Sequence, residues 1–255
     1  MDRLDSYLVT HNLVSTRNKG QYEIEQGNVL VNGKVVTKAS FKVSNEDEVK
    51  VNSTFDYVSK GALKLLKAKD EFNLNFNNKI MLDIGSSTGG FSEVALKNNI
   101  KKVIAVDVGK NQFDEKLKTD KRVELHEETD IRNYVINEKI DIVTIDVSFI
   151  SVTKFLDKIN EINPIEIILL IKPQFECGKE IADKYKGVPL NKEVHEEVIK
   201  KIFKRFSEIN FNVQDLTYSP ITGGSGNIEY LAYFKKEQIK EINVKIVINQ
   251  AFKEL

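Results

Sequence analysis

The stretch Ile80–Phe91, IMLDIGSSTGGF, decides the fold of this chain. Its first five residues are apolar apart from Asp83, which is typical of a short buried strand. A glycine loop follows, and a helix is expected to begin after it, capped by Ser87 or Thr88. Glycine lets a ligand approach the main chain closely, and the loop has three, Gly85, Gly89 and Gly90. This order predicts a small-molecule site at the carboxyl edge of a parallel sheet.

The spacing of these glycines distinguishes two classes of cofactor. Dinucleotide sites favour G-x-G-x-x-G, whereas this loop reads D-x-G-x-x-x-G-G, the first motif of methyltransferases that use S-adenosylmethionine (SAM). The next apolar run, Lys102–Val108, places Asp107 at its end, where an acid can accept hydrogen bonds from ribose hydroxyls in either class. The spacing favours SAM, and a structural glycine turn in some other α/β protein is the alternative.

Composition limits the classes of protein to consider. The chain has 255 residues and a formal net charge of zero, so any nucleic-acid surface must be local. The single cysteine, Cys177, excludes an internal disulfide and suits a reducing compartment. Apolar runs such as Ile167–Ile171 are too short to span a bilayer, and no signal region begins the chain. We expect a cytoplasmic protein that is a monomer and has no membrane partner.

Strands alternate with helices after the glycine loop. This pattern predicts an α/β fold with a Rossmann-like, mostly parallel sheet, and two final strands without a helix between them predict an antiparallel strand at one edge. A preceding helix, Ser59–Phe72, is expected to bury Ala62, Leu63 and Leu66, with its lysines in solvent. The expected strands are Lys102–Val108, Arg122–His126, Ile140–Val147, Ile165–Ile171, Phe211–Tyr218 and Asn227–Phe234, and the helices Ser92–Asn98, Gln112–Leu117, Val152–Asn160 and Asn191–Ile209.

Residues 1–51 differ from the rest and predict a small α+β module. The pair Asn32-Gly33 between β-favouring residues is a strong hairpin signal. Ser15 or Thr16 is expected to cap the second of two short helices. The expected elements are helices Arg3–Val9 and Asn18–Glu25 and strands Asn28–Val31, Lys34–Thr37 and Glu48–Val51. A linker at 52–58, with Phe55 and Tyr57 packed against a domain, would lead to a second domain at 59–255.

The first module resembles the S-four-type RNA-binding domain. The matching residues are Arg3-Leu4-Asp5, Leu8, Ser15-x-Arg17, Gly27-x-Val29-x-Val31-Asn32-Gly33 and Lys38-x-Ser40. The resemblance implies binding of structured RNA through cations that contact phosphates. The cations implied are Arg3, Arg17, Lys19, Lys34 and Lys38, together with Lys60 after the linker. The alternative is that these side chains are merely solvated.

Charged residues stand at the ends of several apolar strands. Asp146 and Lys172 each follow a long apolar run, and Glu229 begins the last strand. A charge in such a place is costly unless it is paired or used. Since ligands in open α/β sheets lie outside the carboxyl ends of the strands, these groups and Asp83 and Asp107 are candidates for one site. Structural ion pairs are the alternative.

The second domain is similar to the TlyA family, a branch of the FtsJ-like ribose 2′-O-methyltransferases. The matching runs are Ser59-Lys60-Gly61-Ala62-Leu63-Lys64-Leu65, Asp83-x-Gly85-x-Ser87-Thr88-Gly89-Gly90-Phe91, Asp107-Val108-Gly109, Asp146-x-Ser148-Phe149-Ile150-Ser151, Lys172-Pro173-Gln174-Phe175-Glu176-x-Gly178-Lys179, Ser219-Pro220-Ile221 and Gly226-Asn227-x-Glu229. The resemblance implies a catalytic tetrad of Lys64, Asp146, Lys172 and Glu229. The SAM-binding residues it implies are Asp83, Gly85, Ser86, Ser87, Thr88, Gly89, Gly90, Phe91, Asp107, Val108, Asp130 and Asp146.

Two positions depart from the family pattern. Lys60 stands where the family usually has arginine, which leaves catalysis intact but alters an RNA or interdomain contact. Asp130 stands where an asparagine is usual. His11, His126 and His195 lack metal-ligand spacing, so no metal is expected. Lys200, Lys201, Lys204 and Arg205 are expected to form a solvated helix face.

The tetrad suits methylation of a ribose 2′-hydroxyl, which is a weak acid that must lose its proton as it attacks. A lysine ordinarily titrates near pH ~10.4, and a general base works only if its pKa approaches the working pH. Our hypothesis is that Lys172 takes the proton, Asp146 and Glu229 orient it, and Lys64 tunes it electrostatically.

The resemblance implies an enzyme that methylates a cytidine in ribosomal RNA within a ribosomal subunit. In the family, short termini are found in members that act on the large subunit alone. We therefore expect this chain to act on the large subunit rather than on the small one. One alternative is a haemolysin-type or purely RNA-binding protein with a vestigial methyltransferase fold. A NAD-dependent enzyme is a further alternative, disfavoured by the glycine spacing.

Overall fold

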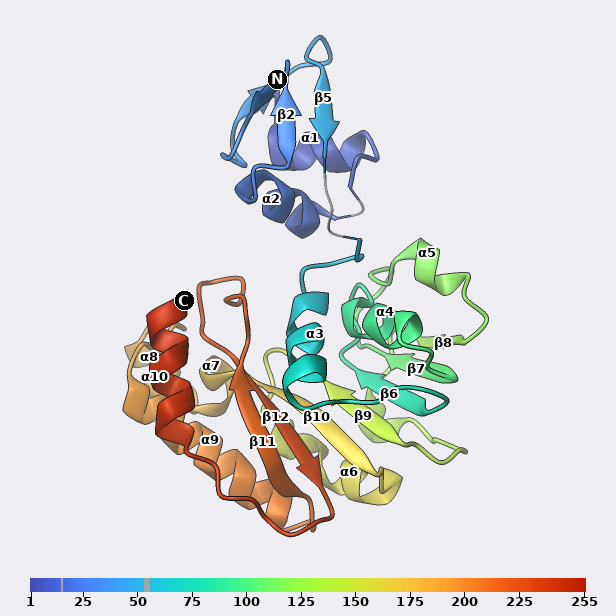
Figure 1. Ribbon diagram of the computed structural model, residues 1–255, viewed down its shortest axis with the longest axis vertical. Coiled ribbons are helices and arrows are strands. Elements are labelled where there is room, and N and C mark those ends of the chain that lie inside the picture. Colours follow the sequence, from blue (N-terminus) through green and yellow to red (C-terminus); the bar gives the residue numbers. More distant parts are fainter. Residues whose placement is uncertain (15, 53–55) are drawn as a thin grey trace.

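The computed structural model describes residues 1–14, 16–52 and 56–255, which form a small N-terminal unit above a larger sheet with helices on both faces (Figure 1). Ser15 and Phe55, named above as a helix cap and a packing aromatic, lie outside these residues. Among the described residues, no helix is long and apolar enough to cross a membrane.

The N-terminal unit has the two helices and the hairpin that were predicted. Thr16 caps the second helix by accepting a hydrogen bond from the backbone N–H of Lys19 at 3.2 Å. Asn32 and Gly33 have φ values of +50° and +76°, as a tight hairpin turn requires. The pairing of β1 with β4 was not predicted, because each strand has only two residues. The elements are α1 (Leu4–Thr10), α2 (Arg17–Glu25), β1 (Asp2–Arg3), β2 (Val29–Val31), β3 (Lys34–Val35), β4 (Lys42–Val43) and β5 (Val49–Val51).

The large sheet has seven strands in the order β11-β12-β10-β9-β6-β7-β8. All neighbouring pairs from β10 to β8 are parallel, which confirms the predicted Rossmann-like sheet. The strands are β6 (Ile80–Ile84), β7 (Lys102–Val106), β8 (Val123–His126), β9 (Ile142–Ile145), β10 (Glu166–Ile171), β11 (Asn212–Tyr218) and β12 (Tyr230–Lys235). The glycine-loop strand β6 therefore lies within the parallel part of the sheet, flanked by β9 and β7.

The antiparallel strand is β12, and it lies one position in from the edge, between β11 and β10. Its register pairs Tyr230 with Ile171, the last residue of β10. Because the two strands run in opposite directions, Glu229 before β12 and Lys172 after β10 emerge at the same edge. Asp146 follows β9 at that edge as well.

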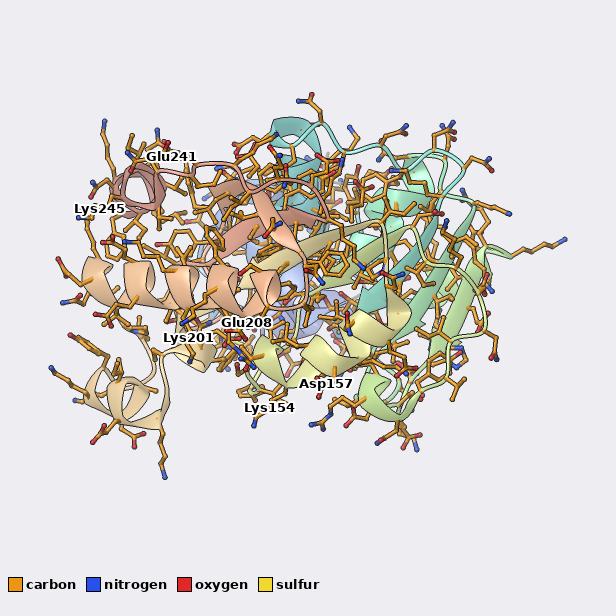
Figure 2. The ribbon with its side chains drawn as sticks, turned by 90° about the horizontal axis from the view of Figure 1, so that it is seen from below. Lys154, Asp157, Lys201, Glu208, Glu241 and Lys245 are labelled. Carbon is orange, nitrogen blue, oxygen red and sulfur yellow. The ribbon has the colours of Figure 1, made fainter. Side chains whose placement is uncertain are left out.

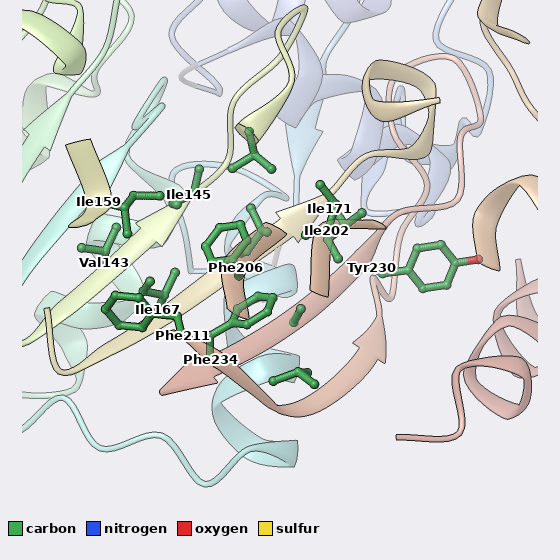
Figure 3. Close-up of a cluster of buried hydrophobic side chains, with 14 of the residues drawn as sticks. Val143, Ile145, Ile159, Ile167, Ile171, Ile202, Phe206, Phe211, Tyr230 and Phe234 are labelled. Atoms are coloured by element: carbon green, nitrogen blue, oxygen red, sulfur yellow. The ribbon is translucent and has the colours of Figure 1, made fainter. Parts of the chain in front are cut away.

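Alternating strand residues pack against helices on opposite faces of the sheet. Ile167, Leu169 and Ile171 of β10 face one cluster, whereas Ile168 and Leu170 face the other. The first cluster, shown in Figure 3, is covered by α6 (Leu156–Ile162), α9 (Lys192–Ser207) and α10 (Val244–Glu254). The second is covered by α3 (Ala62–Glu71), α4 (Gly90–Lys97) and α5 (Glu115–Lys118). Burial on both faces explains why the parallel strands read as continuous apolar runs.

Several local predictions were wrong. The α3 helix buries Ala62, Leu65 and Ala68, whereas Leu63 and Leu66 are only half-buried. Neither Ser87 nor Thr88 caps α4, because the N-cap position is Gly89, which has no side chain to cap with. The pattern also gave no sign of α7 (Pro173–Glu176), α8 (Lys179–Lys184), α10 or the 3-10 turn η1 (Ile131–Asn133), and the helix predicted over Val152–Asn160 begins as a 3-10 turn, η2 (Val152–Phe155). On α9, Lys200, Lys201, Lys204 and Arg205 are all exposed, which agrees with the predicted solvated face; Lys201 is labelled in Figure 2.

Candidate active site

The carboxyl edge of the sheet brings four charged side chains together. Lys172 Nζ lies 2.5 Å from Asp146 Oδ1, and Lys64 Nζ lies 2.7 Å from Glu229 Oε2. Lys64 Nζ is also 3.9 Å from Asp146 Oδ2, which links the two pairs into one chain of alternating charge. Three of these residues follow or precede strands, and Lys64 reaches in from α3.

Most of this charge network is buried, and burial and the neighbouring charges shift the pKa values of Lys64 and Asp146. Lys64 is only 8% exposed, and Lys172 and Glu229 are also buried. Burial alone lowers the pKa of Lys64, but the carboxylates of Asp146 and Glu229 raise it by more, so it lies above its ordinary value. Burial alone raises the pKa of Asp146, but the positive charges of Lys64 and Lys172 lower it by more, so it lies below its ordinary value. Lys64 is therefore a fixed cation in this site.

Lys172 has a different set of partners. Its Nζ contacts one carboxylate, that of Asp146, and donates a hydrogen bond to Ser148 Oγ at 2.9 Å. Lys64 instead stands between two carboxylates. The hydroxyl partner of Lys172 can reorient during a proton transfer.

A cavity of about 550 Å³, which we call the loop cavity, opens beside the glycine loop. Its lining includes the apolar residues Ile84, Ile131 and Phe155 and the acidic residue Asp107. The carboxylate of Asp107 accepts hydrogen bonds from the backbone N–H groups of Ser87 and Gly109 at 2.8 and 2.6 Å. These bonds fix its position and leave lone pairs for a ligand hydroxyl.

Gly85 shows why the loop needs glycine. Its φ is +81°, and a Cβ added there would lie 2.4 Å from the carbonyl oxygen of Asp146. The glycine loop and the loop after β9 therefore touch through their backbones. Any side chain at Gly85 would separate the two loops that line the cavity.

A second cavity of about 670 Å³, the lysine cleft, adjoins the first. Its lining includes the whole tetrad, Lys60, and three residues from the N-terminal unit, Thr16, Asn18 and Gln21. The two cavities share Gly85, Ser87, Asp146, Ser148 and Phe149 in their linings. Two reactants held in adjoining cavities would therefore meet at Asp146 and Ser148, beside Lys172.

The predicted SAM-binding residues divide between these cavities. The loop cavity is lined by Gly85, Ser87, Asp107, Val108, Asp130 and Asp146, and the lysine cleft also by Asp83, Ser86, Thr88, Gly90 and Phe91. Gly89 lines neither, because it packs against Phe113 and Leu117 beneath the loop. Asp130 forms an ion pair with Arg132 at 2.5 Å, so its carboxylate is already occupied by a cation.

Asp83 is held inside the protein. It is 1% exposed and accepts hydrogen bonds from Ser92 Oγ at 2.7 Å and Thr144 Oγ1 at 2.8 Å. Burial raises the pKa of Asp83 to about 6, although these hydrogen bonds oppose the rise. The carboxylate thus links β6 to α4 and β9 at a cost to stability near neutral pH.

The variant Asp83→Asn should be more stable than the wild type at pH 8 but not at pH 4. The pKa of Asp83 is higher in the folded state than in the unfolded state, so its protonated form stabilises the fold below pH ~4. This contribution disappears as the pH rises through about 6. The difference in unfolding free energy should grow by about 3 kcal/mol over that range. Urea denaturation of both proteins at the two pH values tests this, and an equal difference at both would contradict it.

The structure gives some of the predicted RNA-binding cations other partners. Arg3 and Arg17 both contact the buried carboxylate of Asp5, at 3.0 and 2.9 Å. Burial raises the pKa of Asp5, but hydrogen bonds from Arg3, Gln21 and Arg17 bring it well below its ordinary value. Lys19 Nζ donates to the carbonyl oxygen of Tyr57 at 2.6 Å, between the two units. Lys34 and Lys38 are exposed, and Lys60 lines the lysine cleft.

Sequence reasoning gave no role to Phe149. This residue is 90% exposed, has a φ of +67° and lines both cavities. Its ring centroid lies 5.1 Å from that of Phe175. An exposed aromatic with a backbone angle that non-glycine residues avoid indicates a functional position. The run Asp146-x-Ser148-Phe149 contained the residue, but no pattern in it signals exposure or a positive φ.

Comparison with known proteins gives full-length matches. A family described as FtsJ-like methyltransferase matches residues 57–236, and one described as S4 domain matches residues 2–49. Hemolysin A of Brachyspira hyodysenteriae is 41% identical over 91% of this chain and 99% of its own. The 23S rRNA (cytidine-2'-O)-methyltransferase TlyA of Campylobacter jejuni is 37% identical over 90% of this chain and 98% of its own. The 16S/23S rRNA (cytidine-2'-O)-methyltransferase TlyA of Mycobacterium tuberculosis is 31% identical, over 95% and 93%.

Proposed function

This chain belongs to the FtsJ-like methyltransferase family and carries an S4 domain, and on that basis we propose that it methylates ribosomal RNA. The reaction is transfer of a methyl group from SAM to the ribose 2′-hydroxyl of a cytidine. The observation that supports it most strongly is the Lys64–Glu229 and Lys172–Asp146 network, which lines a cleft that adjoins the glycine-loop cavity. The enzyme would act in the cytoplasm, where ribosomal subunits are assembled.

The loop cavity suits SAM in size and in chemistry. Asp107 would hold the ribose hydroxyls, and Ile84, Ile131 and Phe155 would face the adenine. The lysine cleft suits a polar group, because two of its lining atoms, Ser86 Oγ and Gln174 Oε1, are buried without a partner among the described residues. When bound, SAM supplies a methyl group on a positively charged sulfur, and the C–S bond breaks as the new O–C bond forms.

Lys172 is the group that takes the proton from the 2′-hydroxyl. It must be neutral when it accepts the proton, and Lys64 Nζ lies on the other side of the same carboxylate, that of Asp146. Asp146 keeps Lys172 Nζ in place, and Ser148 Oγ accepts one of its hydrogen bonds. Glu229 holds Lys64 and accepts a hydrogen bond from Gln174 Nε2 at 3.2 Å. Proton removal by a positioned base typically contributes 10²–10⁴-fold to a rate.

Phe149 is placed to stack on a base of the substrate. It stands where the two cavities meet, and a nucleotide base must leave its helical stack for its ribose to reach the cleft. The variant Phe149→Ala should raise the KM for ribosomal subunits about tenfold, since stacking is typically worth ~1–3 kcal/mol per base. Steady-state methyl transfer measures this, with Phe41→Ala on the N-terminal unit as an exposed aromatic control. An unchanged KM would remove the stacking role.

The choice of ribosomal subunit is the finer part of the proposal. We favour the large subunit, on which the relative from Campylobacter jejuni is named as acting, over the small one. Purified protein and radiolabelled SAM would be incubated with each isolated subunit from cells that lack the gene. Label on the large subunit alone is the expected result. Label on the small subunit alone would overturn the preference, and label on neither would overturn the ribosomal substrate.

A further inference from the structure

One buried carboxylate beside the active site has no part in the reaction described above. Glu176 ends α7 and is 5% exposed. No ion pair to this carboxylate is found among the described residues, since Lys201 Nζ donates instead to the backbone oxygen of Glu176, at 3.3 Å. Burial raises the pKa of Glu176 despite its hydrogen bonds. A group that is this costly to bury calls for a compensating role.

Both oxygens of this carboxylate hold one loop that belongs to another strand. Oε2 accepts a hydrogen bond from Ser151 Oγ at 2.6 Å, and Oε1 accepts one from the backbone N–H of Val152 at 2.7 Å. Residues 146–151, which we call the β9 loop, connect β9 to η2. Glu176 therefore ties the segment after β10 to the segment after β9.

The β9 loop presents the groups that the reaction uses. Ser148 accepts the hydrogen bond of Lys172, and Phe149 projects between the two cavities. Phe149 has a φ of +67° and its side chain is almost fully exposed, although its ring contacts that of Phe175. Such a backbone angle persists only where the surroundings restrain it. The two hydrogen bonds to Glu176 provide a restraint within three residues of Phe149.

We propose that Glu176 is a positioning residue, whose carboxylate fixes the β9 loop and thereby holds Ser148 and Phe149 in place for methyl transfer. This inference rests on the proposed function for its link to catalysis. Its structural half, the restraint of the loop, is independent of any substrate. The role requires two hydrogen-bonding atoms and no negative charge.

Two substitutions of Glu176 test whether the role needs hydrogen-bonding atoms but no charge. In Glu176→Gln the amide oxygen still accepts from Val152 N–H, and the amide nitrogen can donate to Ser151 Oγ, which then accepts. In Glu176→Ala both bonds are lost. The expected kcat/KM is within about threefold of wild type for the glutamine variant. For the alanine variant it is lower by roughly 30- to 100-fold, because small displacements of positioning groups cost that much. Equal losses in both would show that the charge matters and would overturn the proposal.

The chain has no tryptophan, so Phe149→Trp places a single fluorescent reporter on the loop. In this background, Glu176→Ala should lower the steady-state anisotropy of the tryptophan, whereas Glu176→Gln should leave it unchanged. Glu166, a second buried carboxylate at the opposite end of β10, is the matched control. Glu166→Gln should leave the reporter unchanged. An unchanged reporter in Glu176→Ala would overturn the restraint.

Two further arms keep the test decisive. If Glu176→Ala does not fold, Ser151→Ala removes one of the two hydrogen bonds to Glu176. It should lower kcat/KM about three- to tenfold and lower the anisotropy of the tryptophan reporter. If neither quantity changed, the proposal would be overturned. The fluorescence arm needs no substrate. A wild-type protein without activity on ribosomal RNA would therefore refute the proposed function, while the reporter still decides whether Glu176 restrains the loop.

Discussion

Lys172→Ala should lower kcat for methyl transfer about 10³-fold and leave the Kd for SAM within threefold of wild type. Lys172 is the proposed general base, and removal of such a group typically costs 10²–10⁴-fold. It lines the lysine cleft and not the loop cavity, so the SAM site stays intact. Methyl transfer to ribosomal subunits measures kcat, and calorimetry measures SAM affinity. The control is Lys79→Ala, because Lys79 forms an ion pair with Glu166 at the opposite end of the sheet.

Lys172→Arg distinguishes a base from a positive charge. Arginine can keep an ion pair with Asp146, but its guanidinium does not lose its proton in proteins. If Lys172 acts as the base, the arginine variant should be as slow as the alanine variant. Activity of Lys172→Arg near the wild-type level would show that the site needs only a cation there and would remove the proposed proton transfer.

Asp146→Asn should lower both activity and stability. Asp146 is the carboxylate shared by the two lysines, 2.5 Å from Lys172 Nζ and 3.9 Å from Lys64 Nζ. Without its negative charge the two buried cations repel each other, and Lys172 loses the partner that orients it. We expect kcat to fall about 10³-fold and the free energy of unfolding by about 2–3 kcal/mol, since breaking a buried pair leaves an uncompensated charge.

A second substitution separates these two effects. Adding Lys172→Met to Asp146→Asn removes the repulsion, so stability should return to near the wild-type value while activity stays lost. The matched control is Asp141→Asn, at the opposite end of β9, where the carboxylate accepts a hydrogen bond from the backbone N–H of Ile80. Its kcat should be unchanged. Recovery of activity in the double variant would contradict the account of the network.

The sheet and most of the charged site could be predicted because parallel strands end at one edge. Asp146 and Lys172 follow apolar runs, so the sequence alone indicates that they converge. Lys64 could not be found in this way. Helical periodicity suggests a solvated lysine, yet Lys64 is buried because Asp146 and Glu229, remote in sequence, pair with it. Only the family resemblance pointed to it.

Other features depend on partners that no local pattern shows. Arg3 and Arg17 look like free cations in the sequence, but both contact the buried Asp5. No local pattern marks Phe149, whose φ is positive and whose side chain is almost fully exposed. The missed helix α10 covers the edge strand β11, which becomes clear only when the strand order is known.

The most direct test of the central claim is the chemical position of the transferred methyl group. Subunits from cells that lack the gene would be methylated with isotopically labelled SAM, digested to nucleosides and analysed by mass spectrometry, with Lys172→Ala in parallel. The account predicts labelled 2′-O-methylcytidine with the wild-type protein and at most a trace with the variant. A labelled methyl group on a base, or equal labelling by both proteins, would contradict it.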